Sequence, residues 1–530
     1  MLTSEKNKEV EHERDTSLEL DVEENGPRQT LQRQVSGPPY SVFSSRMKIW
    51  IIFLVSISAL ISPFGATLVL PALNVLTDVL DITPTKANIS ITTYMIAQAI
   101  APAIIGAMSD TSGRRLSFIL CYIIYIVANV GLALQTNYVA LLILRMVQAV
   151  GCSAAISLAF AIVSDIATSA ERGKYMGYAG AGILCGPAFG PTIGGILAQF
   201  LGWRSIFWFL AIFAGVLLVL FTFLFPETCR NVVGNGSIPA RGINRSVISC
   251  IQQRKLAKQS TLAEEGQESN ADAPPARPKI SLNPLATFSI FTEKESCIIL
   301  LYNGFFFTGM MITTSSIPDL FKTAYNLNEL DIGLCYIASG IGSLISSLSM
   351  GHVVDWNFRR HAARLNMPIS KGKQQDLGDF PIERVKLEIV LPGHVIGILG
   401  LIMFGWTVKF QTHLAGPEIA LFITGFGIST AFNITNGLLI DLHRDKPAAA
   451  TAAVNFARCL MSAGGSAAII PMCRAMNPGW AFTFVGLVYV VLIGVVVWIM
   501  RNGLRWRQDA AEASRLKIDG HKEAIAQDRA

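Results

Sequence analysis

The stretch Gly106–Arg115 reads GAMSDTSGRR, and the stretch Gly351–Arg360 reads GHVVDWNFRR. Glycine, aspartate and two arginines fall at the same offsets in both stretches, and their first residues lie 245 positions apart (351 minus 106). Each stretch follows what the apolar pattern predicts to be the second span of its half. A charged turn repeated at the same place in two apolar halves is typical of membrane transporters built from internal repeats.

The composition is that of a membrane protein. Hydrophobic residues make up 51% of the chain and charged residues 15%, whereas soluble domains carry about 25% charged residues. Apolar runs of about 20 residues recur, each long enough for a helix to cross a bilayer. Irregular backbone is not viable in lipid, so we expect helices throughout. The predicted spans are 48–70, 87–109, 116–134, 138–163, 174–199, 205–225, 296–317, 331–354, 387–409, 417–440, 447–472 and 478–500.

The distribution of charge predicts the orientation. If the N-terminus is cytosolic, the short cytosolic loops hold thirteen Lys and Arg residues and the outer loops hold five. Cytosolic loops are the ones enriched in these residues, so both termini are predicted to be cytosolic. The net charge of +6 then reflects anchoring beside anionic lipid and implies no nucleic-acid partner. The predicted regions are a disordered cytosolic tail (1–46), a six-helix bundle (47–225), a cytosolic central loop (226–295), a second six-helix bundle (296–500) and a cytosolic C-terminal tail (501–530).

The repeated stretch suggests a conformational latch. Gly113 permits a tight turn, and Arg114 lies at the same predicted membrane face as Asp165 at the end of span four. An Arg114–Asp165 ion pair could hold one conformation and separate when the two halves rock. The alternative is an ordinary basic turn beside a helix-end acid. The predicted latch residues are Gly106, Asp110, Gly113, Arg114, Arg115, Asp165, Asp355 and Arg359.

The first stretch resembles motif A of the major facilitator superfamily, G-x-x-x-D-x-x-G-R-R/K. The second copy departs from it, because Phe358 replaces the glycine. The resemblance implies an all-α membrane protein with twelve transmembrane helices in two pseudo-symmetric six-helix bundles. It also implies that Asp110 faces the N-terminus of span eleven, where the helix dipole favours an acid.

Span four carries a charge inside an apolar run, in LRMVQAVGCSAA. A charge at that depth is costly, so Arg145 should face an aqueous cavity or a polar partner. The segment resembles motif B, R-x-x-Q-G, although Ala149 stands where the glycine is usual. The resemblance implies that Arg145 and Gln148 serve substrate binding or proton coupling. The alternative is a structural arginine bonded to carbonyl groups between helices.

Span five reads GAGILCGPAFGPTIGG and places four glycines on one helix face. Such a face allows close helix packing, and each proline removes a backbone hydrogen bond and favours a bend. The segment resembles motif C, G-x-x-x-G-P-x-x-G, of the antiporter branch, which implies export. A merely tight helix pair is the alternative. The residues concerned are Gly182, Gly186, Pro187, Gly190, Pro191 and Gly194.

Pro-Glu-Thr after span six resembles the fungal twelve-span drug:proton antiporter family. The GNGSIP that follows resembles the branch that contains quinidine-resistance and citrate exporters. The resemblance covers about 47–500. It implies efflux of drugs, toxins or secondary metabolites, with protons as a coupled partner.

The charges within the spans favour a second interpretation. Arg145 and Arg458 lie well inside spans, and no Asp or Glu lies in the middle of one. A positive cavity would attract anions, so export of organic anions such as citrate is the alternative. Arg458 could also face the interior of the second half. A transporter-like receptor is a third hypothesis. The predicted substrate or coupling residues are Arg145, Gln148, Arg458, Asn303, Asn433 and Asn455.

The remaining expectations concern modification, cofactors and location. Asn88-Ile-Ser90 is a weak glycosylation sequon, because it lies so close to span two. We expect no metal, no cofactor and no enzymatic activity, since the sequence holds no CxxC pair, phosphate loop or nucleophile–base pair. A monomer in the plasma membrane is expected, with the vacuolar membrane as the alternative.

Overall fold

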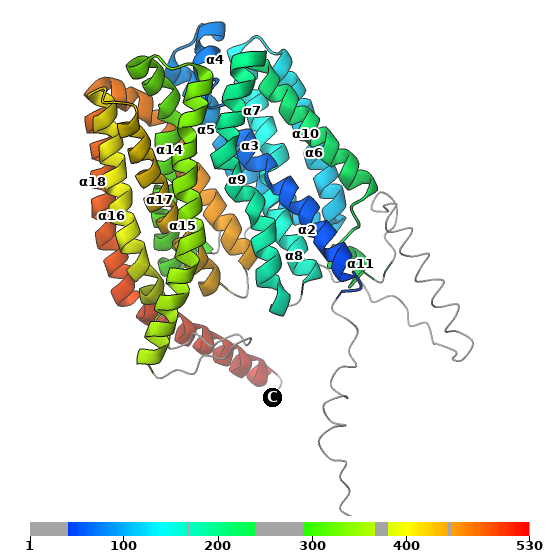
Figure 1. The fold of residues 1–530 in the computed structure, drawn as a ribbon. Helices are drawn as coiled ribbons and strands as arrows, with labels where there is room; N and C mark the ends of the chain where they lie inside the picture. The colour runs from blue at the N-terminus through cyan, green and yellow to red at the C-terminus, as the bar shows by residue number, and fades with distance from the viewer. Residues whose placement is uncertain are drawn as a thin grey trace, which may run out of the picture. The chain divides into compact units, whose positions relative to one another are not determined.

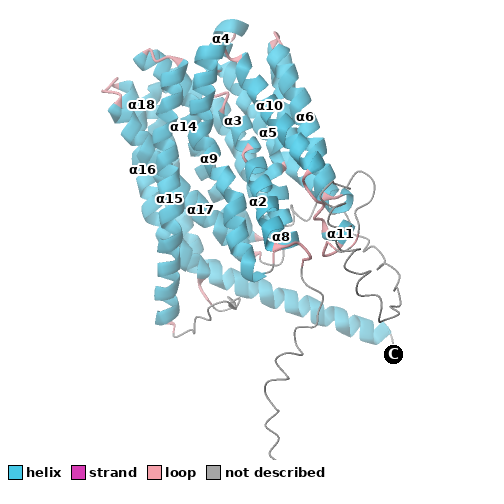
Figure 2. Cartoon of the chain, turned by 45° about the vertical axis from the view of Figure 1, so that its right-hand side comes forward, coloured by secondary structure: helices cyan, strands magenta, loops and turns pink. Residues whose placement is uncertain are grey.

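The computed structural model describes residues 41–167, 169–236, 238, 290–365, 380–443 and 447–528. These residues form helices and no strand (Figure 2). Within the described residues, ten helical stretches are long and apolar enough to cross a membrane, and two of these stretches consist of two consecutive helices each. The helices are α2 (Ser45–Ala59), α3 (Ile61–Thr67), α4 (Leu73–Leu80), α5 (Pro84–Ser112), α6 (Arg114–Leu134), α7 (Tyr138–Ser153), α8 (Ala155–Ile166), α9 (Ser169–Leu201), α10 (Arg204–Phe223), α11 (Arg230–Val233), α14 (Lys294–Tyr325), α15 (Glu329–Arg364), α16 (Ile382–Lys409), α17 (Ala415–Leu442) and α18 (Pro447–Asp528).

Most predicted spans coincide with one helix, but four do not. The first span is divided into α2 and α3, and the fourth into α7 and α8. The eleventh and twelfth spans are joined in α18, which is broken at Asn477 with φ 60° and ψ 160°. Pro478 follows this break and cannot continue the hydrogen bonding of the preceding helix. The predicted tail 1–46 and central loop 226–295 lie largely outside the described residues.

The helix ends follow from local chemistry. Thr83 caps α5 by accepting a hydrogen bond from the backbone N–H of Lys86, and Pro84 occupies the first turn, where its missing N–H costs nothing. At the other end, Gly113 separates α5 from α6 with φ 105°, a conformation that favours glycine. The expected tight turn of the first charged stretch is therefore present.

The second charged stretch forms no such turn. Helix α15 runs through Phe358 to Arg364, ten residues beyond the predicted end of span eight at 354 (Figure 1). Phe358 occupies the place of Gly113, and a bulky residue rarely adopts a positive φ. The helix consequently continues where the first half turns.

The two halves of the fold, α2–α10 and α14–α18, pack against each other through α5 with α18 and α9 with α15. Several hydrogen bonds between them lie toward the end of the helices that carries Asp78 and Lys322, which we call the joined end. There, buried Asn74 donates through Nδ2 to the carbonyl of Pro318 at 2.7 Å. Lys322 Nζ lies 2.9 Å from Asp78 Oδ2. The opposite end, which carries Gly113, is called the motif end.

Candidate functional site

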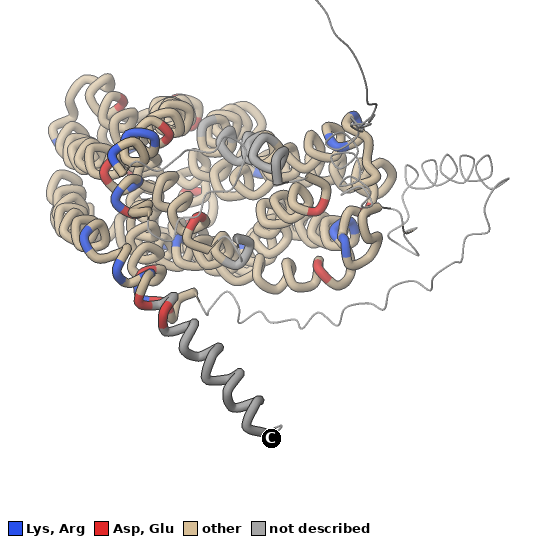
Figure 3. Tube along the Cα trace, turned by 90° about the horizontal axis from the view of Figure 1, so that it is seen from below, with Lys and Arg blue, Asp and Glu red and all other residues tan. Residues whose placement is uncertain are grey.

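Arg114 is the centre of a buried ion cluster at the motif end. Its Nε donates to Asp165 Oδ2 at 3.0 Å, which is the pair suggested by the sequence. The same guanidinium donates to Asp110 at 2.5 Å and to the Ser109 hydroxyl at 2.6 Å. Figure 3, viewed from this end, shows acidic and basic residues at helix ends of both halves. The cluster ties the end of α5 to the end of α8 through the start of α6.

Glu227 completes this cluster, although it was not among the predicted site residues. Its buried carboxylate accepts hydrogen bonds from the backbone N–H groups of Arg114, Arg115, Thr228 and Cys229, at 2.9 to 3.2 Å. An anion at the start of α6 is favoured by the helix dipole. The Pro-Glu-Thr segment thus supplies the acid that caps α6. This segment is the sequence feature from which the role of Glu227 could have been predicted.

Arg115 and Cys229 also form hydrogen bonds between helix ends near Glu227. The Arg115 guanidinium donates to the carbonyls of Phe221 and Thr222, which are the unpaired acceptors at the end of α10. Burial raises the pKa of the Cys229 thiol to about 11, so the thiol stays neutral and donates to the carbonyl of Asp110. The first half is therefore bound together at the motif end through α5, α6, α8 and α10.

The second copy does not form a corresponding latch, and this corrects the expectation for Asp355 and Arg359. Both side chains are exposed on the continued helix α15, and neither forms an ion pair with another described residue. The physical reason is the missing glycine, because without a turn these residues stay on the exposed helix. The buried residue of this copy is Asn357, whose Nδ2 donates to the carbonyl of Val385 at 2.7 Å.

Lys386 and Asp441 form an ion pair near the motif end of the second half. Lys386 Nζ lies 2.7 Å from Asp441 Oδ2 and joins α16 to α17, with side-chain exposures of 12% and 35%. In the first half, the Arg114–Asp165 pair joins α6 to α8, which belong to the third and fourth spans. Helices α16 and α17 are the ninth and tenth spans, so the two ion pairs join equivalent spans of the two halves. The pairing was not predicted, because the sequence places Lys386 only in a basic loop.

Arg145 lies inside the first half rather than on its surface. Its side chain is 1% exposed, its Nη1 donates to the carbonyl of Gly65 at 2.8 Å and to Gln148 Oε1 at 2.6 Å, and its guanidinium lies 4.4 Å from the Tyr94 ring centroid. Gln148 in turn donates to Asn129 at 2.7 Å. This is the geometry of an arginine that links helices, which is the structural alternative to a substrate ligand. Its Nε and Nη2 atoms donate to no residue in the described part of the chain.

Arg458 lies where the two halves meet. Its Nε and Nη2 donate to Asn455 Oδ1 at 3.1 and 2.7 Å, and its guanidinium lies 4.8 Å from the Phe307 ring centroid. Asn455 donates to the carbonyl of Gln98 on α5 at 2.9 Å, so this face of α18 lies against the first half. Arg458 is partly exposed and pairs with no described carboxylate.

The two other predicted asparagines lie within the second half. Asn303 is buried and donates to the Thr435 hydroxyl at 2.8 Å. Asn433 donates to the Ser347 hydroxyl at 3.0 Å. Their amide groups join α14 to α17 and α15 to α17, respectively, and neither lines the pocket between the two halves.

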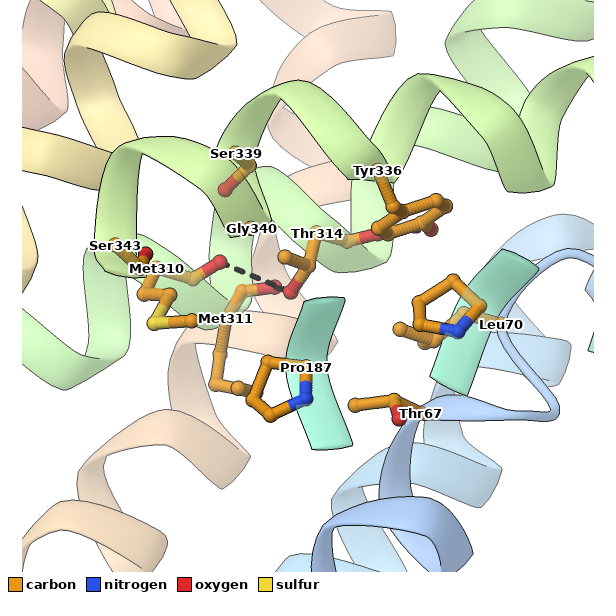
Figure 4. Close-up of a pocket in the computed structure, with 11 residues that line it drawn as sticks. Thr67, Leu70, Pro187, Met310, Met311, Thr314, Tyr336, Ser339, Gly340 and Ser343 are labelled. Carbon is orange, nitrogen blue, oxygen red and sulfur yellow. Dashed lines mark hydrogen bonds between the residues drawn. The ribbon is translucent and has the colours of Figure 1, made fainter. Parts of the chain in front are cut away.

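That pocket receives side chains from both halves, which point into it (Figure 4). All of its lining residues are uncharged, and neither Arg145 nor Arg458 is among them. The expectation of a cavity lined by two arginines is therefore not met by this pocket. Tyr336 donates its hydroxyl proton to the carbonyl of Thr314, which leaves the ring as an apolar surface. The lining consists of Thr67, Leu70, Pro187, Pro191, Met310, Met311, Thr314, Tyr336, Ser339, Gly340 and Ser343.

The glycines of α9 lie against the first span, where no side chain fits. A Cβ atom on Gly186 would lie 2.3 Å from Pro63, one on Gly190 would lie 2.1 Å from the Thr67 hydroxyl, and one on Gly194 would lie 2.0 Å from the Leu68 carbonyl oxygen. The close approach carries Pro187 and Pro191 to the pocket. Gly182 is in α9, but its surroundings lie outside the described part of the chain.

Replacing Gly194 with alanine is expected to destabilise the protein by about 1–3 kcal/mol, because the new methyl group meets a backbone oxygen that cannot rotate away. The measurement is thermal unfolding of the purified protein together with its amount in the membrane. Gly215→Ala in α10 is the control, because a Cβ there meets nothing within 4 Å. Equal unfolding temperatures for the two variants would show that Gly194 and Leu68 are not in close contact.

Asn88, the residue of the weak glycosylation sequon, lies at the boundary between the two halves. Asn88 is 2% exposed, and its Nδ2 donates to the carbonyl of Ser466 on α18 at 3.3 Å. The nitrogen that would carry a glycan is therefore enclosed between the two halves. Asn88 instead joins them, close to Thr92, whose hydroxyl oxygen lies 3.2 Å from that of Ser466.

The sequence of this chain matches a known protein family over most of its length. The family model of the Major Facilitator Superfamily matches residues 55–466. The chain belongs to the major facilitator superfamily. The relatives of this transporter include MFS-type transporter phiD of Fungal sp. (strain ATCC 74256), 39% identical over 93% of this chain and 74% of that protein. Citrate exporter 1 of Aspergillus niger is 35% identical over 93% of both chains.

Solved structures agree with this assignment. The xylose transporter XylE of E. coli has a TM-score of 0.60 at 16% identity and covers 86% of this chain and 98% of its own. The human organic anion transporter MFSD10 has a TM-score of 0.54 at 14% identity and covers 87% of this chain and 100% of its own. These similarities concern the fold alone. The major facilitator protein described here is a multi-pass membrane transporter and not an enzyme.

Proposed function

We propose that this transporter exports small molecules by alternating access, with protons moving in the opposite direction. The observation that carries the proposal is the uncharged pocket between the halves, because a site shared by two rocking halves is exposed to each side in turn. Its methionine, proline and tyrosine surfaces suit drugs, toxins or secondary metabolites. The glycine–proline row of α9, which resembles the antiporter motif, forms one wall of the pocket and supports the outward direction.

Export of organic anions such as citrate is the second candidate. It is favoured by Arg458, which is partly exposed at the boundary between the halves without an acidic partner among the described residues. The similarity to Citrate exporter 1 also supports it. Since no aspartate or glutamate lies in mid-span, the proton would be carried by an acidic residue near a helix end. Asp319, 3.6 Å from Arg474, and Asp441 are the candidates.

The orientation and the membrane of this transporter are also part of the proposal. The basic loops favour cytosolic termini, which places the motif end in the cytosol and the joined end outside. We propose the plasma membrane as the site of export, with the vacuolar membrane as the alternative. In both membranes the tails would remain in the cytosol.

The test is export from yeast that lacks its own major exporters and expresses this chain. Citrate and the lipophilic cation rhodamine 6G are followed side by side, with and without a protonophore. Export of the cation that stops with the protonophore supports drug:proton antiport. Export of citrate alone supports the second candidate. If neither compound leaves faster than from cells with an empty vector, the proposed efflux of these two classes is wrong.

A further inference from the structure

Arg458 and the uncharged pocket lie along the same face of α14. Phe307, whose ring centroid lies 4.8 Å from the Arg458 guanidinium, and the pocket residues Met310, Met311 and Thr314 are spaced at i, i+3, i+4 and i+7. Residues with this spacing share one helix face. The rise of a helix places Phe307 about 6 Å along the axis from Met311. Because α14 runs from the motif end to the joined end, the cation lies on the motif-end side of the pocket.

The face of α18 that carries Arg458 belongs to the boundary between the halves. Asn455, Arg458, Ser462 and Ser466 follow at helical spacing, and two of them contact the first half directly. Asn455 donates to Gln98 on α5, and the Ser466 hydroxyl lies 3.2 Å from that of Thr92. Ser462 faces Thr308 of α14 at 3.5 Å. Arg458 therefore points between α5 and α14 rather than into lipid.

The surroundings of Arg458 leave its charge available. Among the described residues, its side chain donates to one neutral amide oxygen, Asn455 Oδ1, and its guanidinium lies 4.8 Å from the Phe307 ring centroid. Arg458 Nη1 forms no hydrogen bond with a described residue, so it can donate to a carboxylate. Arg145 differs, since it is fully enclosed by the first half and bonded to Gly65 and Gln148.

We infer that the substrates of this transporter are amphiphilic monoanions, in which one carboxylate binds Arg458 and an apolar or aromatic body lies against Met310 and Met311. The inference rests on the proposed function, because it names the substrate class for the same pocket. A small polyanion such as citrate would satisfy the arginine but leave the methionine and proline surfaces uncovered. A lipophilic cation would contact the same apolar surface but meet the charge of Arg458.

The test uses two compounds of almost equal shape, 1-naphthylacetate and its neutral amide, 1-naphthylacetamide. Binding of each radiolabelled compound to the full chain in lipid nanodiscs is measured by equilibrium dialysis. We expect the carboxylate to bind about tenfold more tightly than the amide. Arg458→Gln should remove this preference by weakening the carboxylate alone, whereas Arg458→Lys should keep most of it. Arg505→Gln, the same change at an exposed position on α18, is the matched control and should keep all of it.

A pocket variant tests the other half of the inference. Met311→Ser should weaken both compounds by a similar factor, because it shortens the apolar wall without touching the cation. The inference is overturned if wild-type protein binds the acid and the amide equally or binds neither. It is also overturned if citrate displaces 1-naphthylacetate as well as unlabelled 1-naphthylacetate does. Binding does not depend on the direction of transport. If the chain prefers 1-naphthylacetate to the amide but exports nothing, the proposed function is refuted and this inference is retained.

Discussion

Replacing Glu227 with alanine is expected to lower the free energy of unfolding by about 3–5 kcal/mol, the largest loss of stability that we predict for this chain. The variant leaves four backbone N–H groups, those of Arg114, Arg115, Thr228 and Cys229, without their acceptor in a buried corner. It also removes the anion from the start of α6. The measurement is thermal unfolding of the purified protein, together with its amount in the membrane.

Thr228→Val provides the control beside it. The Thr228 hydroxyl is buried and forms no hydrogen bond with another described residue, so replacing it with a methyl group should leave stability unchanged or raise it. Glu227→Gln should lie between the two, because one oxygen acceptor remains while the amide N–H₂ opposes a backbone donor. An alanine variant as stable as Thr228→Val would show that the carboxylate does not hold this corner together.

A disulfide between α5 and α18 is expected to abolish transport. The hydroxyl oxygens of Thr92 and Ser466 lie 3.2 Å apart across the boundary between the halves, so paired cysteines at these positions can approach bonding distance. Oxidation of Thr92→Cys/Ser466→Cys would prevent the joined end from opening. We expect export to fall more than tenfold and to return with a reductant.

The matched control places the same bond within one half. The hydroxyl oxygens of Ser346 and Thr430 lie 2.7 Å apart between α15 and α17, which move together if the halves rock as units. Oxidised Ser346→Cys/Thr430→Cys should retain export. Retained export by the oxidised cross-half variant, with the disulfide verified by mass spectrometry, would contradict rocking at the joined end.

The sequence predicted the helices well because lipid leaves a chain few alternatives. Runs of about 20 apolar residues must be helical in a bilayer, so span positions followed from hydropathy alone. The turn at Gly113 followed from local chemistry, since glycine tolerates the observed φ of 105°. The continuation of α15 through Phe358 could have been predicted by the same reasoning, but the repeat of the surrounding charges concealed it.

The candidate site was harder to predict because its contacts are distant in sequence. Glu227 binds backbone groups 112 and 113 residues earlier, and backbone donors leave no trace in a sequence pattern. The buried position of Arg145 shows only that it needs polar partners. The carbonyl of Gly65 and the amide oxygen of Gln148 are two such partners, and a sequence pattern does not distinguish them from a substrate. Whether a residue of α7 reaches the pocket depends on helix packing, and a polar residue within a span does not specify it.

The central claim is that this chain moves small molecules out of the cell by alternating access. Its most direct test is the steady-state ratio of intracellular to external concentration in energised yeast, with this chain or an empty vector. Rhodamine 6G, citrate and 1-naphthylacetate are measured in parallel. We predict a lower ratio for at least one compound, restored to the vector value in oxidised Thr92→Cys/Ser466→Cys cells. A ratio equal to that of the vector for all three compounds, or a higher ratio for any of them, would contradict export.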